Sequence, residues 1–133
     1  MRVLLVEDES PWAEVIGAGL RERGHEVVWV VGFRSMPDSD GIAQGIKPHH
    51  EDVADTTIPL QLGDFDLAFL DNMLAGSYVG LLIMGELAKA GVPTCGMSSG
   101  AKINATLMKA GAVTTRLKKD VVSNLDAILE QLS

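Results

Sequence analysis

Acidic side chains follow the first apolar run of the sequence, where they could bind a cation. The stretch RVLLVEDES places Glu7, Asp8 and Glu9 directly after apolar residues, and Asp71 ends a second apolar run, DLAFLD. Two carboxylates about 4 Å apart repel by roughly 4 kcal/mol at an effective dielectric constant near 20. Lys118 alone would leave such a group negatively charged. Mg²⁺ prefers carboxylate and water oxygens, so these residue types predict a magnesium site.

The elements that must position these residues alternate between strands and helices. Short, apolar, β-rich runs predict buried strands at residues 2–6, 26–31, 66–70, 94–97 and 112–117. Apolar periodicity predicts one helix from Ser10 to a stop at Gly24, and others at about 78–90, 101–110 and 120–132. This alternation predicts an α/β fold, a doubly wound five-stranded parallel sheet with helices on both faces.

One segment does not fit the alternation. Residues 32–65 contain Pro37, Pro48 and Pro59 together with four glycines, and they show no sustained helical period. A helix with its two loops would need fewer residues. We therefore expect an atypically long irregular segment between the second and third strands.

The helix expected at 78–90 is apolar over more than one face. Val79, Leu82, Ile83 and Leu87 form one stripe, while Leu81 and Met84 are expected to point elsewhere. Since the element before the third strand is the neighbour of this helix in such a fold, residues 32–65 are the nearest candidate cover. A partner or dimer face is the alternative.

Polar residues end four of the five predicted strands. The first strand ends in Glu7 and Asp8, the third in Asp71 and the fourth in Ser98, and the fifth runs into Lys118. In an open parallel sheet all strand C-termini lie at one edge, where such folds carry out their chemistry. The sequence therefore predicts that these side chains converge on one functional site.

Four stretches, in order, resemble the receiver domain of two-component response regulators. They are VLLVEDES, DLAFLDNML, GVPTCGMSSG and AGAVTTRLKK, and the resemblance covers nearly the whole chain. It implies the flavodoxin-like fold of the chemotaxis-regulator type and one receiver domain over residues 1–133 without an output domain. It also implies a phosphoprotein of phosphorelay signal transduction, acting as a stand-alone switch through protein–protein contacts.

The resemblance also implies roles for single residues. Asp71 would be the nucleophile that accepts a phosphoryl group from a histidine kinase, a histidine phosphotransfer protein or a small phosphodonor. Lys118 would pair with Asp71 and then with the phosphoryl oxygens, and Ser98 would hydrogen-bond the phosphoryl group after it arrives. The chemistry would be positioning and charge neutralisation, as in phosphoryl transfer generally.

The implied cofactor is Mg²⁺. Asp8 and Asp71 would bind the ion directly, with the backbone carbonyl of Met73 as a third ligand, and Glu7 would act through a metal-bound water. Two simpler interpretations remain for single residues: Glu7 and Asp8 could cap the first helix, and Ser98 could cap a later one.

The sequence departs from the receiver pattern at three positions. Lys119 stands where receivers usually have a proline joined by a cis peptide bond, so we expect this loop to be trans or rebuilt. Thr115 replaces the usual aromatic residue that reports phosphorylation, and Ala75 replaces a common proline. These departures leave Asp71, Ser98 and Lys118 unchanged, but they affect the residues through which phosphorylation would change the conformation of a receiver.

Composition excludes several other functions. The net charge is −7 without a basic cluster, which argues against direct nucleic-acid binding. The apolar run near Leu81–Met84 is too short to cross a bilayer, and acids interrupt the N-terminal run before it could form a signal peptide. The single Cys95 fits a small buried hydrophobe. We expect a cytoplasmic protein that catalyses at most its own phosphorylation and dephosphorylation.

Two alternatives to a phosphorylated receiver remain open. One is a pseudo-receiver that acts as a phosphorylation-independent interaction module. The other is a flavodoxin-like or other Mg²⁺-dependent enzyme on the same fold. The downstream partner is unknown, and a homodimer is left open.

Overall fold

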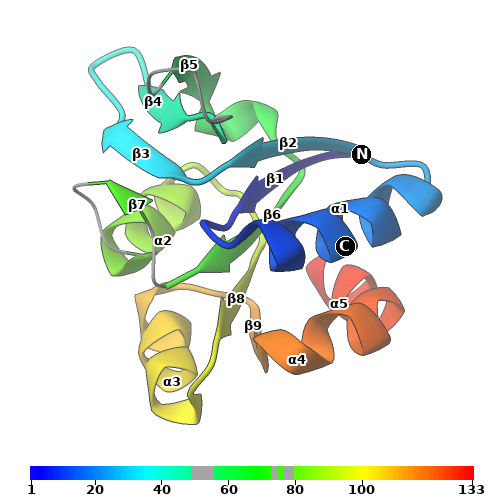
Figure 1. Cartoon of the computed structure of the whole chain (residues 1–133). Coiled ribbons are helices and arrows are strands. Elements are labelled where there is room, and N and C mark those ends of the chain that lie inside the picture. The colour runs from blue at the N-terminus through cyan, green and yellow to red at the C-terminus, as the bar shows by residue number, and fades with distance from the viewer. Residues whose placement is uncertain (49–55, 73–74, 77–79) are drawn as a thin grey trace.

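A five-stranded parallel sheet forms the centre of the computed structural model, which describes residues 1–48, 56–72, 75–76 and 80–133 (Figure 1). The strands are β1 Arg2–Val6, β2 Glu26–Val30, β6 Leu67–Asp71, β8 Thr94–Ser98 and β9 Thr114–Leu117. They lie in the order β2-β1-β6-β8-β9, and every neighbouring pair is parallel. The predicted doubly wound sheet is confirmed, and its five strands fall close to the predicted ranges.

Helices cover both faces of this sheet. Figure 1 shows α1, α4 and α5 on one face and α2 and α3 on the other. Their bounds are α1 Ser10–Glu22, α2 Gly80–Lys89, α3 Ala101–Ala110, α4 Lys118–Val121 and α5 Leu125–Leu132. The 3₁₀ turn η2, Val122–Asn124, separates α4 from α5. The single helix expected at 120–132 is therefore wrong, because the helical segment starts at Lys118 and is interrupted.

Each face of the sheet has its own hydrophobic core. On one face Leu5 packs with Ile16 of α1 and Ile128 of α5. On the other face Leu4 belongs to a cluster with Ile83 of α2. All of these side chains are fully buried, and burying each one contributes about 1.5–3 kcal/mol. The two cores hold the strand ends in a fixed relation to one another.

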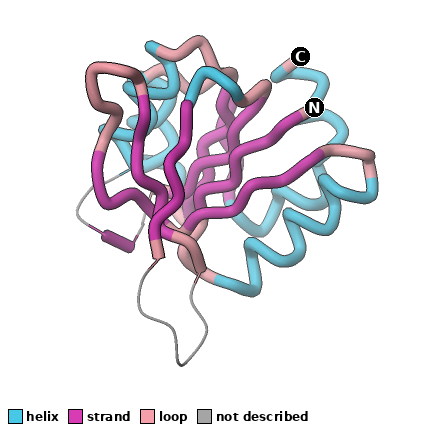
Figure 2. Tube along the Cα trace, turned by 90° about the horizontal axis from the view of Figure 1, so that it is seen from above, coloured by secondary structure: helices cyan, strands magenta, loops and turns pink. Residues whose placement is uncertain are grey.

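The segment between β2 and β6 forms a second sheet. It contains β3 Gly32–Ser35, β4 Ile42–Ile46, β5 Thr57–Gln61 and the 3₁₀ turn η1 Leu62–Asp64, and β7 Ala75–Gly76 joins it in the order β5-β4-β3-β7. Figure 2 shows it on the side of the molecule away from α1 and α5. The expected long segment is present, but its described part is not irregular. The prediction failed because these strands are short and pair with one another across the chain rather than by a local period.

The second sheet covers α2, as the apolar surface of that helix predicts. Phe33 of β3 and Leu60 of β5 share a cluster with Ile83 and Met84 of α2. The predicted stripe on α2 needs correction. Met84 is fully buried, whereas Leu82 is 56% exposed. Val79 lies outside the described residues.

β5 is the outer strand of the second sheet among the described residues. Its Pro59 lies opposite Gln44 of β4. Lys47 N donates to Thr56 O at 2.8 Å, and hydrogen-bonded pairs alternate along an antiparallel ladder. The pair Gln44–Pro59 is therefore a non-hydrogen-bonded one, and the proline nitrogen faces away from β4. At this position a missing N–H removes no bond from the sheet.

Gly96 brings α3 close to β8. A Cβ at this position would lie 2.8 Å from Cδ1 of Leu107, so a larger residue would force the side chain of Leu107, or the helix that carries it, to move. Leu107 is fully buried in this contact. The close approach places the first turn of α3 beside the C-terminal end of β8. Among the described helices, none has the length and apolar character that crossing a membrane would need.

Candidate functional site

Four acidic residues meet at the C-terminal edge of the central sheet. Glu7 follows β1 and Asp71 ends β6, and the register of these adjacent strands pairs Val6 with Leu70. One carboxylate oxygen from each of Glu7, Asp8, Glu9 and Asp71 lies within 4.8 Å of all the others. Glu7 and Asp71 are buried, with 0% and 1% exposure, whereas Asp8 and Glu9 are exposed. The structure therefore brings the predicted acidic ligands Glu7, Asp8 and Asp71 together, and it places Glu9, which was not predicted as a ligand, beside them.

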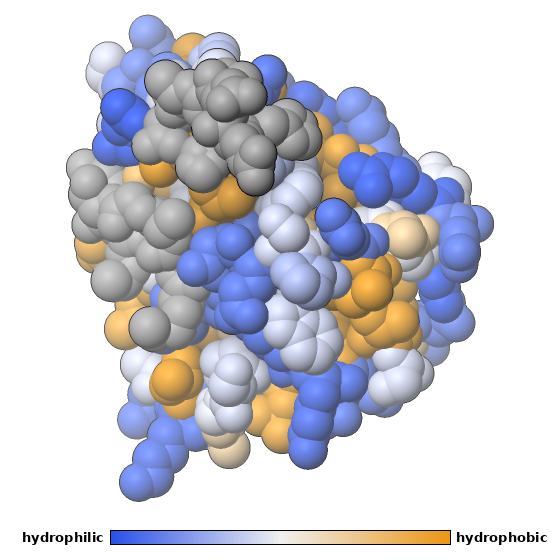
Figure 3. Space-filling model, viewed as in Figure 1, coloured by the Kyte–Doolittle hydropathy of each residue, from blue (hydrophilic) through white to orange (hydrophobic). Residues whose placement is uncertain are grey.

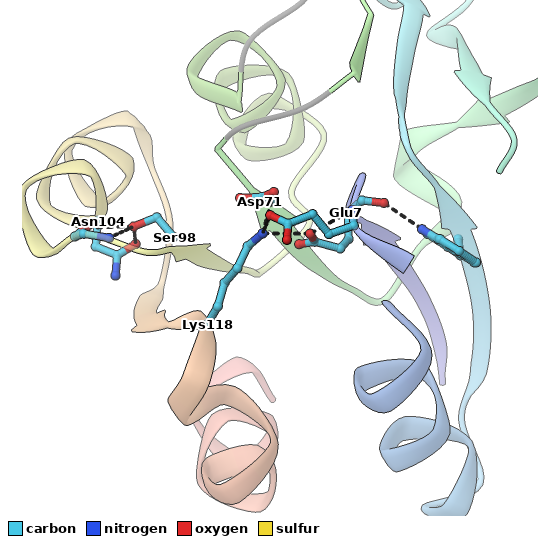
Figure 4. Close-up of polar contacts among 8 residues, drawn as sticks. Glu7, Asp71, Ser98, Asn104 and Lys118 are labelled. Carbon is cyan, nitrogen blue, oxygen red and sulfur yellow. Dashed lines mark hydrogen bonds and ion pairs between the residues drawn. The ribbon is translucent and has the colours of Figure 1, made fainter. Parts of the chain in front are cut away.

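Lys118 reaches this acidic cluster from the start of α4 (Figure 4). Its Nζ lies 2.8 Å from Oε1 of Glu7, 3.0 Å from Oδ2 of Asp71 and 3.1 Å from Oε1 of Glu9. An ammonium group has three donors, and three carboxylates surround this one. Lys118 is itself buried. The predicted pairing of Lys118 with Asp71 is present.

Burial and charge shift the protonation of the cluster. Burial raises the pKa of Glu7 to about 7; the charge of Asp71 acts in the same direction, and the hydrogen bond with Lys118 opposes it. Burial alone would lower the pKa of Lys118, but hydrogen bonds to Glu7, Asp71 and Glu9 raise it overall. Lys118 is therefore charged at neutral pH, while the carboxyl group of Glu7 is only partly ionised near pH 7. One ammonium does not fully compensate the cluster.

The donor set of this cluster fits a hard divalent cation. Oε2 of Glu7 is buried and has no hydrogen-bond partner among the described residues. A buried, unsatisfied polar atom costs about 1–3 kcal/mol, more when charged. Carboxylate oxygens are the ligands that Mg²⁺ takes in proteins, and Glu7, Asp8 and Asp71 supply them here. Met73, the other predicted ligand, lies outside the described residues.

The backbone of Glu7 is held from β2. Trp29 donates from Nε1 to the carbonyl oxygen of Glu7 at 2.8 Å, and Glu7 N donates to Val30 O at 3.1 Å. Sequence reasoning missed Trp29, although an indole in a strand beside a polar edge needs a partner for its N–H. These bonds fix the carbonyl side of Glu7 and leave its carboxylate free to face the cluster. Figure 3 shows hydrophilic side chains gathered at the centre of this face, in front of the ends of β1 and β6.

Ser98 ends β8 at the same edge, but its hydroxyl group is engaged elsewhere. Its Oγ lies 2.7 Å from Gly100 O and 2.9 Å from Oδ1 of Asn104 (Figure 4). Ser98 is 1% exposed. The sequence correctly predicted its strand end but missed Asn104, a buried polar residue in the first turn of α3. Neither capping alternative holds, because the caps of α1 and α3 are Glu9 and Gly100 and neither helix has a side-chain capping bond.

The departures from the receiver pattern have structural counterparts. The described residues contain no cis peptide bond, so the Lys118–Lys119 bond is trans, as expected. Lys119 is exposed and Thr115 is half-buried in β9. Ala75 lies in β7, where it pairs with Gly32 of the second sheet.

Several solved structures that share the fold of this chain are described as receiver domains. No family model matches the chain, and no curated protein sequence does. A receiver domain of the sensor histidine kinase PA1611 from Pseudomonas aeruginosa PAO1, with magnesium coordinated in its active-site cleft, has a TM-score of 0.68 at 20% identity, over 98% of this chain and 95% of that one. The BeF₃-activated receiver domain of Klebsiella pneumoniae RstA has a TM-score of 0.67 at 22% identity, over 99% and 98%.

A third similar structure is described as an example of alternate folding. It is the signal receiver domain of a modulated diguanylate cyclase from Desulfovibrio desulfuricans G20, with a TM-score of 0.65 at 17% identity, covering 98% of this chain and 91% of that one. Together these likenesses show that the chain has the receiver fold.

Proposed function

We propose that this chain is a response-regulator receiver that accepts a phosphoryl group on Asp71. The observation that carries the proposal is the position of Lys118, whose Nζ lies between the buried carboxylates of Asp71 and Glu7, at 3.0 Å and 2.8 Å. A purely structural ion pair would need one carboxylate, whereas this site concentrates several around one ammonium and leaves a buried oxygen of Glu7 unsatisfied. Such clustering of perturbed groups at a sheet edge is typical of a functional site.

The reaction would be a displacement at phosphorus. An oxygen of Asp71 forms a bond to the phosphorus of a phosphohistidine, and the phosphorus–nitrogen bond breaks with its electron pair going to the imidazole. The donor would be a histidine kinase or a histidine phosphotransfer protein, and a small phosphodonor could replace it. Lys118 already contacts Asp71, so it is placed to neutralise oxygens of the arriving group. The chain would catalyse at most its own phosphorylation and dephosphorylation.

The acids would hold Mg²⁺ during this step. Asp8 and Asp71 would be direct ligands with the carbonyl of Met73, and Glu7 would act through a bound water. When bound, the ion neutralises negative charge on the carboxylates and on the phosphoryl oxygens. The unsatisfied Oε2 of Glu7 supports this assignment.

A phosphorylation-independent interaction module is the second candidate. The hydroxyl group of Ser98 is turned toward Asn104, and Thr115 replaces the usual aromatic residue. Both observations concern the response to phosphorylation rather than the acceptance of the group. The acidic cluster with Lys118 favours the first candidate.

Intact mass after incubation with Mg²⁺ and acetyl phosphate separates the two candidates. The wild type should gain the mass of one phosphoryl group, and Asp71→Asn should not. Asp64→Asn, an exposed acid before β6, is the matched control and should gain it as the wild type does. A gain that persists in Asp71→Asn would refute the acceptor, and no gain in the wild type would favour the interaction module.

A further inference from the structure

We infer that Asn104 is a positioning residue for Ser98, and that it holds the serine hydroxyl away from the acidic cluster until a phosphoryl group competes for it. This inference rests on the proposed function. Figure 4 shows Ser98 and Asn104 side by side, with Glu7, Asp71 and Lys118 as a separate group. The phosphoryl group would therefore have to break one contact of Ser98 to gain another.

The hydroxyl group of Ser98 has three polar contacts, all with Gly100 and Asn104 among the described residues. Its Oγ lies 2.9 Å from Oδ1 of Asn104 and 2.7 Å from Gly100 O, and it accepts from Gly100 N at 3.2 Å. One hydroxyl proton cannot serve two carbonyl oxygens at once. A half turn of the Asn104 amide would present Nδ2 to Ser98, and then the hydroxyl donates to Gly100 O while it accepts from Asn104. The Ser98–Asn104 contact is kept in either orientation.

The contact between Ser98 and Asn104 is buried, which strengthens its influence on the orientation of Ser98. Ser98 is 1% exposed and Asn104 is 6% exposed, so bulk water offers neither side chain a ready alternative partner. Asn104 is also fixed through its backbone, because Asn104 N donates to Gly100 O at 3.2 Å. Gly96 allows α3 to pack closely on β8 and so brings the two side chains within reach. The position of Asn104 is therefore set by the fold and not by Ser98 alone.

The contact with Asn104 therefore makes it less favourable for Ser98 to rotate toward a phosphoryl group on Asp71. A ligand shifts a conformation only by the difference between its contacts in the two states. One buried hydrogen bond lost on rotation corresponds to about a fivefold weaker apparent affinity for a phosphoryl group. Removing the contact should therefore strengthen binding of a phosphoryl mimic, which is an effect that damage to the fold would not produce.

The test uses Asn104→Leu, with Thr106→Ala as the control on the same helix. Thr106 is exposed, and the one bond of its hydroxyl group among the described residues is to Lys102 O of its own helix. The first measurement needs no ligand: side-chain couplings of Ser98 by NMR should report one rotamer in the wild type and rotamer averaging in Asn104→Leu. The second measurement is titration with beryllofluoride and Mg²⁺, in which Asn104→Leu should bind about fivefold more tightly.

The same change in a Ser98→Ala background should have no effect on beryllofluoride affinity, because the contact is then already absent. An unchanged Ser98 rotamer, or an affinity that is unchanged or weaker in folded Asn104→Leu, would overturn the inference. If that variant does not fold, Asn104→Ala takes its place under the same criteria. If the wild type binds no beryllofluoride, the proposed function fails, and the Ser98 couplings alone decide the positioning role.

Discussion

Ala75 pairs with Gly32 in parallel register, so Ala75 and Gly76, which follow Asp71 closely in the sequence, are part of the second sheet. Phe33, the next residue of β3, is fully buried in the hydrophobic cluster that includes Ile83 of α2. A displacement of the chain at the acidic cluster would therefore reach β3 through backbone hydrogen bonds. A conformational change that depends on rotation of an aromatic side chain in β9 is not available here, because Thr115 occupies that position and its side chain is small and stiff at χ1.

Addition of beryllofluoride and Mg²⁺ should change the backbone NMR shifts of Gly32 and Phe33 and of residues 98–101. Residues 113–117 and α5 should change little, because a threonine rotation offers little contact difference between the two states. Beryllofluoride without Mg²⁺ is the control. Large shifts centred on β9 and α5, with the second sheet unaffected, would contradict this route.

Mg²⁺ should raise the melting temperature if the proposed site exists, because the ion would bind carboxylates that are assembled only in the folded state. Asp8→Asn should remove most of the increase, and this exposed side chain can be changed without loss of packing. Glu14→Gln, an exposed acid of α1, should keep the increase. A melting temperature indifferent to Mg²⁺ in the wild type would count against a metal site.

In the absence of Mg²⁺, the free energy of unfolding should fall as the pH rises from about 4.5 to about 7. Burial raises the pKa of Glu7 from 4.5 to about 7, so the folded protein retains a proton that the unfolded chain has released. This contribution is complete below pH 4.5 and is lost as the pH rises through 7. Urea unfolding across this range should show a fall of order 3 kcal/mol at most.

The variant Glu7→Gln should flatten that profile, since it cannot titrate. Glu14→Gln should leave it unchanged. A profile that falls equally steeply in Glu7→Gln would show that another group is responsible.

Lys118→Met should lower the free energy of unfolding by about 3–5 kcal/mol, because it leaves the buried carboxylates of Glu7 and Asp71 without their ammonium. Mg²⁺ should restore more stability to this variant than it adds to the wild type. The neighbouring Lys119→Met is the matched control, and its exposed side chain should contribute within about 0.5 kcal/mol. Equal effects of the two substitutions in urea unfolding would rule out the buried arrangement.

Phe33→Ala should destabilise the protein by about 3–5 kcal/mol and expose apolar surface that binds a hydrophobic dye. Phe33 is fully buried and belongs to the same hydrophobic cluster as Ile83 and Met84 of α2. Leu82→Ala, on the exposed side of α2, should have a small effect and no dye binding. A folded, dye-negative Phe33→Ala protein would mean that the second sheet does not cover α2.

The central sheet could be predicted because its strands are buried on both faces and therefore form continuous apolar runs. The convergence of Glu7, Asp71 and Lys118 then follows from parallel topology alone. The orientation of Ser98 could not be predicted in this way. It depends on a contact with Asn104, which belongs to another element and has no periodic signal.

The second sheet was missed for a different physical reason. Its inward positions include Ala43 and Gly45, which give little apolar signal. A Cβ on Gly45 would lie 2.8 Å from Cγ1 of Val30 and 2.9 Å from Cδ1 of Leu60, so close packing requires glycine where a strand pattern would call for a branched residue. In addition, β4 and β5 are separated by residues 47–56 in the sequence, and local residue propensities carry no information on pairing between strands so far apart.

The proline in the outer strand has a consequence for how the molecule behaves at high concentration. The edge strand of a sheet has unpaired backbone N–H groups, and a strand of another molecule can pair with them. The outward position at the middle of β5 is Pro59, which has no N–H to offer. Open-ended self-assembly along this edge is thereby interrupted at its centre. We expect Pro59→Thr to keep the fold but to form thioflavin-positive aggregates sooner than the wild type on prolonged, agitated incubation.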